Sequence, residues 1–431
     1  MTARSALRRY LLVCFLTWLP AGLMLTSMVL LMAERGLTLA EIGLVFTVFS
    51  LVTVCLELPT GGLADVVGRR VVLAVSAGFT VAALALMAVS TTFWMFLLTG
   101  VLKGVARALS SGPATAWYVD TLHDLEGPGA DLKPGLARGG ALESVALCVG
   151  VLAGGFVPLV APGHLVLPLA VPPMLGALAA AVLLVVVVLA LPEPSHARLP
   201  LDGMLRAVPA TVAASVRLVT GHVVLRRLVV FYLVSGMVLT AIELLTPGRL
   251  AQLAGTAERG SAAYAVVAAL GFAGSAVGSA LAPWAARTAG GSARGGAAGV
   301  VLTALSVGVL AATAGLDGAA GLVGAGGAYV VMFVGMSVTF VLCLEMTHDA
   351  VPAAQRTAVS SAGSLAQQAG GAVSNLGFGV LAGQTGVAAA WALAATLAGV
   401  SALVFVGMPR SDRTRAGRDG KRPAASRKAA Q

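Results

Sequence analysis

Long apolar segments recur along almost the whole chain, and they limit its fold more than any other feature. A helix needs roughly 20 apolar residues to cross about 30 Å of hydrocarbon, and it satisfies its backbone polar groups internally. Only 11% of the 431 residues are charged, whereas soluble domains carry about 25%. We therefore predict an all-α membrane protein with twelve transmembrane helices. The expected spans are 10–33, 40–62, 71–90, 93–117, 138–160, 166–191, 224–246, 261–285, 296–314, 319–344, 357–382 and 386–407.

The basic residues predict how these helices are oriented. The formal net charge is +10. With twelve spans, the loops on one side contain only Arg35, Arg249 and Arg259, while Lys103 and Arg107 lie within a span. The remaining Lys and Arg residues fall in the other loops or near the chain ends, as the positive-inside rule requires of the cytoplasmic face. We therefore predict a cell (inner or plasma) membrane protein with both termini cytoplasmic. Nucleic acid is not an expected partner, because the charges do not gather on one face.

A polar interruption divides the chain into two equal sets of spans. The stretch PEPSHARLPLDG begins at residue 192 and opens the longest such interruption. We predict an N-terminal six-helix bundle over residues 1–194, a cytoplasmic linker over 195–222, a C-terminal six-helix bundle over 223–408 and a basic disordered tail over 409–431. Two pseudo-symmetric bundles predict a binding site between them.

The loop between the second and third spans, GGLADVVGRR at residues 61–70, carries more charge than a turn needs. Its glycines allow a tight turn and close contact. Asp65 can face the positive N-terminal end of a neighbouring helix, and Arg69 and Arg70 can pair with carboxylates or lie at the membrane edge. Two arginines alone would satisfy the orientation rule, so the aspartate and the glycines favour a second role.

This loop resembles the signature G-x-L-A-D-x-x-G-R-R/K of the major facilitator superfamily, which lies between the second and third helices. The preceding ELPT at 57–60 and GPATAWYVD at 112–120 are similar to a bacterial subgroup that resembles drug and metabolite efflux permeases. The resemblance implies a twelve-helix fold in two bundles and transport by alternating access.

The resemblance also implies a conformational latch between the two bundles. Asp65 would contact the start of the eleventh span, near residues 355–360, in the outward-open state. Arg69 or Arg70 would pair with Asp120 at the inner end of the fourth span. The latch residues are therefore Gly61, Asp65, Gly68, Arg69, Arg70 and Asp120.

Five charged residues are expected within the spans, namely Glu57, Lys103, Arg107, Glu143 and Glu243. A charge at mid-bilayer costs on the order of 2.5–3.5 kcal/mol, so each needs a partner or a cavity. Arg107 is expected to share the inner third with Glu57 and Glu143 and to neutralise either acid. Such an ion pair either holds neighbouring helices together or forms a proton-binding site. In a proton-binding site, the carboxyl group becomes protonated more readily when the arginine moves away from it. Lys103 is placed to contact substrate, and Glu243 to attract cations or serve an outer gate.

The chain lacks the signatures of ATP hydrolysis and of common hydrolases. No lysine is followed by Ser or Thr, which excludes a G-x-x-x-x-G-K-[ST] phosphate loop, and neither HExxH nor G-x-S-x-G occurs. The 4 cysteines lie in apolar runs without a C-x-x-C pair, so they are interpreted as packing residues. We predict no enzymatic activity, no cofactor and no metal site.

These observations favour a monomeric secondary transporter in the lipid bilayer. We expect proton-coupled export of a small drug-like or apolar compound. The fifth span lacks the Gly-Pro then Gly-Gly pattern of many drug antiporters, which leaves open an importer or facilitator of a polar metabolite such as a sugar or organic acid. A third alternative is a membrane receptor or scaffold without transport activity, which the absence of a large soluble domain disfavours.

Overall fold

The computed structural model describes residues 1–431 except 61–62, 128, 164–165, 193–216, 353–354 and 409–431. Within the helices it also omits the side chains of residues 58–59, 65 and 356–358. Gly61, most of the predicted linker and the predicted tail therefore lie outside the described residues, as does the side chain of Asp65.

The first half of the molecule, up to residue 190, corresponds to the six predicted N-terminal spans. The first span continues from α1 into α2 across a short break at Thr26 and Ser27. The fourth span is also made of two helices, because Gly112 adopts a φ of 98° and Pro113 begins the next helix. The helices are α1 (Ala3–Leu25), α2 (Met28–Glu34), α3 (Leu39–Thr60), α4 (Leu63–Val67), α5 (Arg69–Val89), α6 (Phe93–Ser110), α7 (Pro113–Glu126), α8 (Lys133–Val160), η1 (Pro168–Ala170) and α9 (Val171–Ala190).

The second half, from residue 223, corresponds to the six predicted C-terminal spans. Gly386, with a φ of 89°, separates the eleventh span from the twelfth. The ninth and tenth are separated by the 3-10 turn η2 (Thr313–Gly315). Both breaks fall in the glycine-rich turns that the sequence indicates. The other elements are α11 (Val223–Ala254), α12 (Ala257–Ala289), α13 (Ser292–Ala312), α14 (Gly318–Ala350), α15 (Arg356–Thr385), α16 (Val387–Ser401) and η4 (Ala402–Phe405).

Eleven helical segments in the described part of the chain are long and apolar enough to cross a membrane. The one expected span that is not among these segments is the eleventh, α15, which is 30 residues long but carries polar side chains such as Gln367, Gln368, Ser374 and Asn375. Its length suits a span, and its polarity arises because it packs between α11 of its own half and α3 of the other half. The predicted all-α membrane fold is confirmed.

Glycines allow the helices of each half to approach closely. In the first half, a Cβ atom added at Gly150 of α8 would lie 2.8 Å from the Leu19 carbonyl oxygen and 2.9 Å from Gly22 Cα, both on α1. Small residues at a helix contact are a usual means of packing in membranes, where backbones meet without a large side chain between them. The small-residue motif beginning at Gly150 therefore forms a helix contact.

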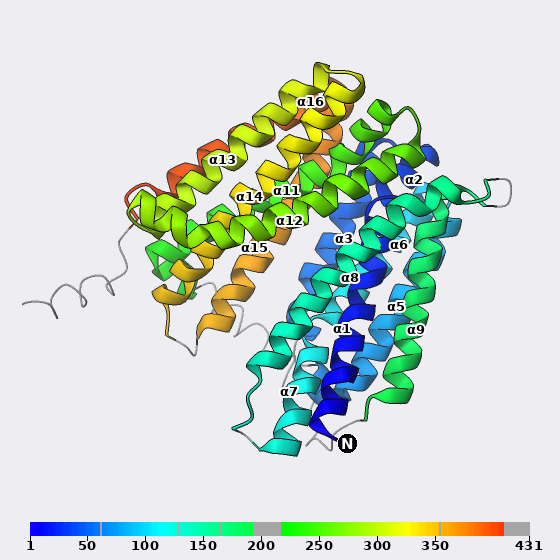
Figure 1. The fold of residues 1–431 in the computed structure, drawn as a ribbon, viewed down its shortest axis with the longest axis vertical. Coiled ribbons are helices and arrows are strands. Elements are labelled where there is room, and N and C mark those ends of the chain that lie inside the picture. The colour runs from blue at the N-terminus through cyan, green and yellow to red at the C-terminus, as the bar shows by residue number, and fades with distance from the viewer. Residues whose placement is uncertain (61–62, 128, 164–165, 193–216, 353–354, 409–431) are drawn as a thin grey trace, which may run out of the picture.

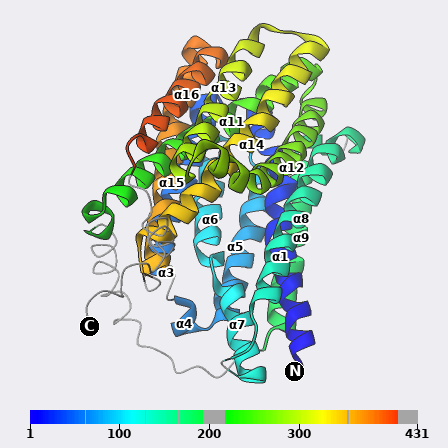
Figure 2. The same ribbon diagram turned by 60° about the vertical axis from the view of Figure 1, so that its left-hand side comes forward.

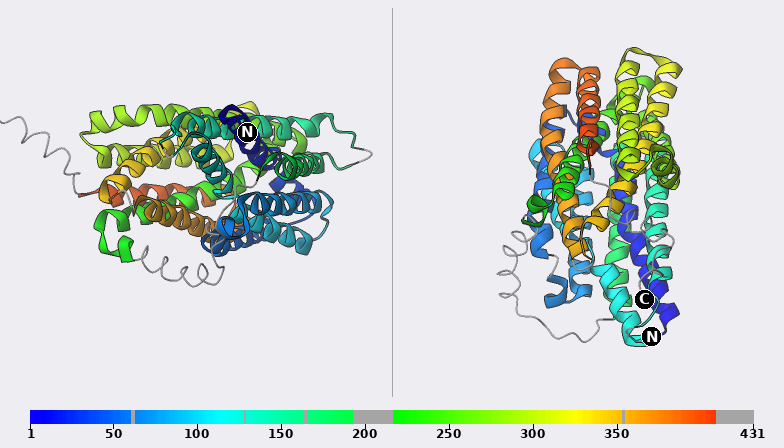
Figure 3. Two further views of the ribbon diagram at one scale, coloured as in Figure 1. Left: turned by 90° about the horizontal axis from the view of Figure 1, so that it is seen from below. Right: turned by 90° about the vertical axis from the view of Figure 1, so that its left-hand side faces the viewer.

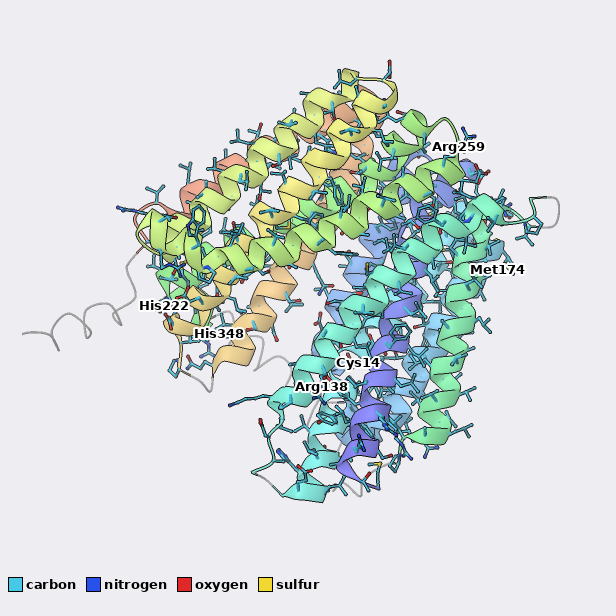
Figure 4. The ribbon with its side chains drawn as sticks, in the orientation of Figure 1. Cys14, Arg138, Met174, His222, Arg259 and His348 are labelled. Carbon is cyan, nitrogen blue, oxygen red and sulfur yellow. The ribbon has the colours of Figure 1, made fainter. Side chains whose placement is uncertain are left out.

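The two halves meet at one end of the molecule and diverge toward the other, as α8 and α12 show in Figure 1. The N terminus, α4 and α7 lie at the diverging end (Figure 2), and the N terminus is again at this end in the right-hand view of Figure 3. We call it the basic end, because the Arg69–Arg70 pair begins α5 there. Figure 4 shows His222 and His348 of the second half well separated from Arg138 of the first half at this end, whereas Arg259 lies near the opposite end.

Buried apolar clusters follow the same division. The largest cluster joins both halves and includes Leu31 of α2, Leu245 of α11 and Tyr264 of α12. Two smaller clusters, one around Trp117 and one around Phe231, each contain residues of a single half. The halves therefore share a core toward the opposite end and have separate cores toward the basic end.

Candidate functional site

The contact between α3 and α15 closes the space between the halves at the opposite end. The backbone of Gly43 lies so close to the carbonyl group of Asn375 that a Cβ atom at Gly43 would clash with the carbonyl oxygen. One turn further along α3, Thr47 Oγ1 donates a hydrogen bond of 3.0 Å to the carbonyl oxygen of Ala372. The two helices are therefore in backbone contact, with little room for water or substrate to pass.

The contact between α8 and α12 closes the other side of the same end. A Cβ atom at Gly155 of α8 would lie 2.9 Å from the carbonyl oxygen of Ser261 and would overlap the side chain of Ala265. Both residues of α12 are fully buried. The helix α2 also packs against α11 and α12. The contacts of α3, α2 and α8 with the second half thus together close the space between the halves at the opposite end.

A polar link between the halves lies nearer the basic end. Gln368 Nε2 of α15 donates a hydrogen bond of 2.9 Å to Glu57 Oε2 of α3. Glu57 is half-buried and lies near the basic end of α3. Since α3 and α15 belong to different halves, this bond must break if the two helices separate here.

Lys103 and Arg107 lie one turn apart on α6, and each contacts an aromatic ring. Lys103 Nζ is 5.4 Å from the centroid of the Phe49 ring on α3 and 3.4 Å from Met28 Sδ on α2. The guanidinium carbon of Arg107 is 5.1 Å from the ring centroid of Trp18 on α1. These distances suit cation–π contacts, which offset part of the cost of placing a cation among apolar groups.

The structure does not bring Arg107 to the two acids with which the sequence suggests it pairs. Among the described residues, Arg107 has no ion pair with Glu57 or Glu143. Glu143 of α8 instead lies near Tyr10 and Cys14 of α1. In this structure the arginine lies over Trp18 and the glutamate lies near Cys14, one turn away on α1, so the expected ion pair of Arg107 with Glu57 or Glu143 is not formed among the described residues.

Glu243 lies apart from the other charged residues of the spans. It is half-buried on α11 between the fully buried Ile242 and Leu244. It acts electrostatically on Tyr264 of α12 and Tyr329 of α14, two buried tyrosines whose ring centroids are 6.1 Å apart. Glu243 is thus surrounded by helices of the second half.

The latch region is ordered around an ion pair at the basic end. Arg69 Nη1 lies 2.5 Å from Asp120 Oδ2 of α7, so the structure contains the contact expected of Arg69 or Arg70. Arg70 instead donates a hydrogen bond to the carbonyl oxygen of Val188 on α9. Gly68 precedes α5 with a φ of 109°, a conformation that only glycine adopts readily.

The short helix α4, which carries Asp65, rests on its own half. Its Ala64 packs with Val72 of α5 and Leu109 of α6 in a small buried cluster of the first half. The expected contact between Asp65 and residues 355–360 falls on side chains that are outside the described set, so it stays a prediction.

Neither Gln368 nor Trp18 is among the site residues predicted from the sequence. The signal for Gln368 was the pair of adjacent glutamines at 367 and 368 in the middle of an expected membrane span. Polar side chains in a membrane helix usually face the protein interior or a cavity.

Two further features do not add to this site. A small cavity lies inside the second half, lined by residues such as Phe231, Thr303 and Ser401. It lies within one bundle and not between the two. In the part of the chain that the structure describes, no group of three or more His, Cys, Asp and Glu side chains is placed to hold a metal ion.

Comparison with known proteins identifies the family. The family model described as Major Facilitator Superfamily matches residues 10–375. Among solved structures, the nucleoside transporter NupG superposes with a TM-score of 0.73 at 14% identity, covering 93% of this chain and 98% of that chain. A mutant of the peptide transporter POT in complex with sulfate gives a TM-score of 0.69 at 15% identity and covers 96% of this chain and 95% of its own.

A human protein shares the fold as well. The organic anion transporter MFSD10 gives a TM-score of 0.57 at 17% identity, covering 94% of this chain and 100% of that chain. No curated protein sequence matches the chain significantly. The family match covers most of the chain, and the solved relatives are transporters. This protein is therefore a multi-pass membrane transporter of small molecules and not an enzyme, and it belongs to the Major Facilitator Superfamily.

Proposed function

We propose that this protein works by alternating access and exports a small, largely apolar compound in exchange for protons. The observation that carries the proposal is the one-sided contact between the halves. They share backbone contacts at Gly43 and Gly155 toward the opposite end and keep separate cores toward the basic end. A transporter built from two bundles exposes its site to one side at a time by rocking one bundle against the other. With the basic end in the cytoplasm, the site opens inward.

Export of an apolar compound is supported by the side chains that surround the charges. Trp18, Met28 and Phe49 present aromatic and thioether groups around Lys103 and Arg107. Such side chains bind apolar bodies of varied shape. A compound of this kind partitions into the cytoplasmic side of the membrane, where the open site can take it up. We propose that the protein acts as a monomer in the cell membrane with both termini in the cytoplasm.

Glu57 is the acid that best suits proton coupling. Its hydrogen bond to Gln368 joins the two halves in the state described here, so its surroundings must change when α3 and α15 separate. A carboxyl group whose surroundings change between two states binds its proton with different affinity in each. Glu143 and Glu243 remain candidates, although both lie against helices of their own half.

Replacing Glu57 with glutamine should uncouple transport from the proton gradient. In everted vesicles, uptake driven by a pH gradient is expected to fall to the level seen without a gradient. Exchange of substrate between the two sides should persist, because glutamine keeps the size of the side chain and can still accept a bond from Gln368. Substrate flux measured with and without the gradient provides the check.

The matched control is Glu143→Gln, which removes an acid from the same half without touching the contact between the halves. If Glu143→Gln abolished the pH dependence while Glu57→Gln retained it, the assignment of the coupling proton to Glu57 would be wrong.

Import of a polar metabolite such as an organic acid is the alternative. The observation that favours it is the presence of Lys103, Arg107, Glu57 and Gln368 together, since charged groups bind polar substrates well. A substrate screen in everted and right-side-out vesicles, with an imposed pH gradient, separates the two directions. If everted vesicles accumulate the substrate against its own concentration gradient, the result supports export. If only right-side-out vesicles accumulate the substrate, the result contradicts export.

A further inference from the structure

Lys103 and Arg107 share one face of α6, because residues four apart lie above one another on a helix. The same stripe also packs against α3, because Gly100, Lys103, Gly104 and Arg107 follow the i, i+3, i+4, i+7 spacing of one helix face. Added Cβ atoms at Gly100 and Gly104 would lie 2.8 Å from the Val45 carbonyl oxygen and from the Val52 side chain, both on α3. The two cations therefore lie beside the close contact between α6 and α3, and their long side chains also reach Met28 of α2 and Trp18 of α1.

The helices around this face connect it to the second half of the molecule. The helices α3 and α8 both contact the second half, through α15 and α12 respectively. The two cations of α6 contact other helices of the first half. Lys103 contacts Met28 of α2, and Arg107 lies over Trp18 of α1. The helix α1 in turn packs on α8. Each of the helices that the cations contact, α1, α2 and α3, therefore either meets the second half itself or packs on α8, which meets it.

The protein itself supplies no carboxylate to these cations in the part of the chain that is described. Neither Lys103 nor Arg107 has an ion pair there, and their contacts are with a thioether and two aromatic rings. Glu57 accepts its bond from Gln368, and Asp120 pairs with Arg69. Lys103 is half-buried and Arg107 is exposed, so an incoming group can reach them.

We propose that the transported compound carries a negative charge, such as a carboxylate or sulfonate, on an aromatic or aliphatic body. Lys103 and Arg107 bind the charged group, and Trp18, Phe49 and Met28 contact the body. Cations within a membrane protein are costly unless a partner neutralises them, and here the substrate is that partner. This inference rests on the proposed function, whose site between the halves it specifies.

The stability of the empty protein tests whether the cations lack an internal partner. The double substitution Lys103→Met and Arg107→Met should leave the melting temperature of the detergent-purified protein unchanged or raise it. The matched control removes the same charges from exposed positions of α8, with Lys133→Met and Arg138→Met. A fall in melting temperature that is specific to the first pair would show that an internal partner exists and would overturn the proposal.

Binding of matched probes tests the substrate class. We expect 1-naphthaleneacetate and 4-phenylbutyrate to bind the wild-type protein in nanodiscs, and their primary amides to bind far more weakly. The affinity of the double variant at 103 and 107 for the acids should be about 10- to 100-fold lower than that of the wild-type protein. The variant Lys103→Arg should retain most of the wild-type affinity. Equal affinity for acids and amides, or no binding of any acid in the series, would contradict the proposal.

The proposed transport function and the proposed anion site can fail separately. If acids bind through Lys103 and Arg107 but no vesicle assay detects flux, the proposed transport function is wrong and the anion site stands. If vesicles export only neutral or cationic compounds, and the double variant exports them normally, the transport function stands and the anion site is wrong.

Discussion

Gly43→Ala should shift the protein away from the state described here and reduce transport strongly. The added methyl group would clash with the Asn375 carbonyl group on α15, and a backbone group cannot move aside as a flexible side chain can. Overpacking of this kind costs about 1–3 kcal/mol, which corresponds to about a 5- to 150-fold change in the balance between two states. Because Gly43 lies where the halves touch, the cost applies only to the state that is closed at the opposite end.

The measurement combines substrate flux with thiol labelling. A single cysteine at Ala40, beside the contact between α3 and Gly379, should react faster with an impermeant reagent from outside when Gly43 is alanine. The matched control is Gly78→Ala on α5, where an added Cβ atom meets nothing within 4 Å. Equal flux and equal labelling in the two variants would show that the contact at Gly43 is not a closed gate.

Asp65→Asn should have the opposite effect on the balance of states and also lower transport. Asp65 lies in the short helix α4, four residues before Arg69, and we propose that it docks on the start of α15 when the basic end closes. An aspartate at a helix N-terminus contributes up to about 2 kcal/mol, so its loss disfavours the state closed at the basic end by up to roughly 30-fold. The protein should still reach the membrane and fold.

A separation of kinetic parameters distinguishes this effect from damage to the binding site. The maximal rate should fall in Asp65→Asn, while the apparent affinity for substrate at the cytoplasmic face stays similar. Asp124→Asn, which removes another acid on an exposed position of α7, serves as the control. Undiminished flux in Asp65→Asn would exclude the latch role.

Much of the architecture could be predicted from the sequence because hydrocarbon thickness fixes the length of each span. The break at Gly386 follows from local chemistry, since its positive φ favours glycine. The Arg69–Asp120 pair was predictable only through the resemblance to a known family, because the two residues lie on different spans. Sequence patterns thus indicate which residues enter the membrane and which lie at its edges.

The partners of the charged residues could not be predicted in the same way. Helical periodicity places side chains on one face of their own helix, but it does not set the rotation of that helix against its neighbours. Arg107 therefore contacts Trp18 and not an acid. The bond between Glu57 and Gln368 joins residues 311 positions apart, in two halves whose relative placement no local pattern encodes.

Distances between the halves, measured at both ends of one protein, test the central claim most directly. Spin labels replace Arg138 of α8 and Arg287 of α12 at the basic end in one variant, and Val160 and Arg259 of the same helices at the opposite end in another. The 4 native cysteines are first removed. When substrate or pH shifts the equilibrium, the first distance should shorten while the second lengthens. Two distances that stay fixed, or that change in the same direction, would contradict alternating access by rocking of the two halves.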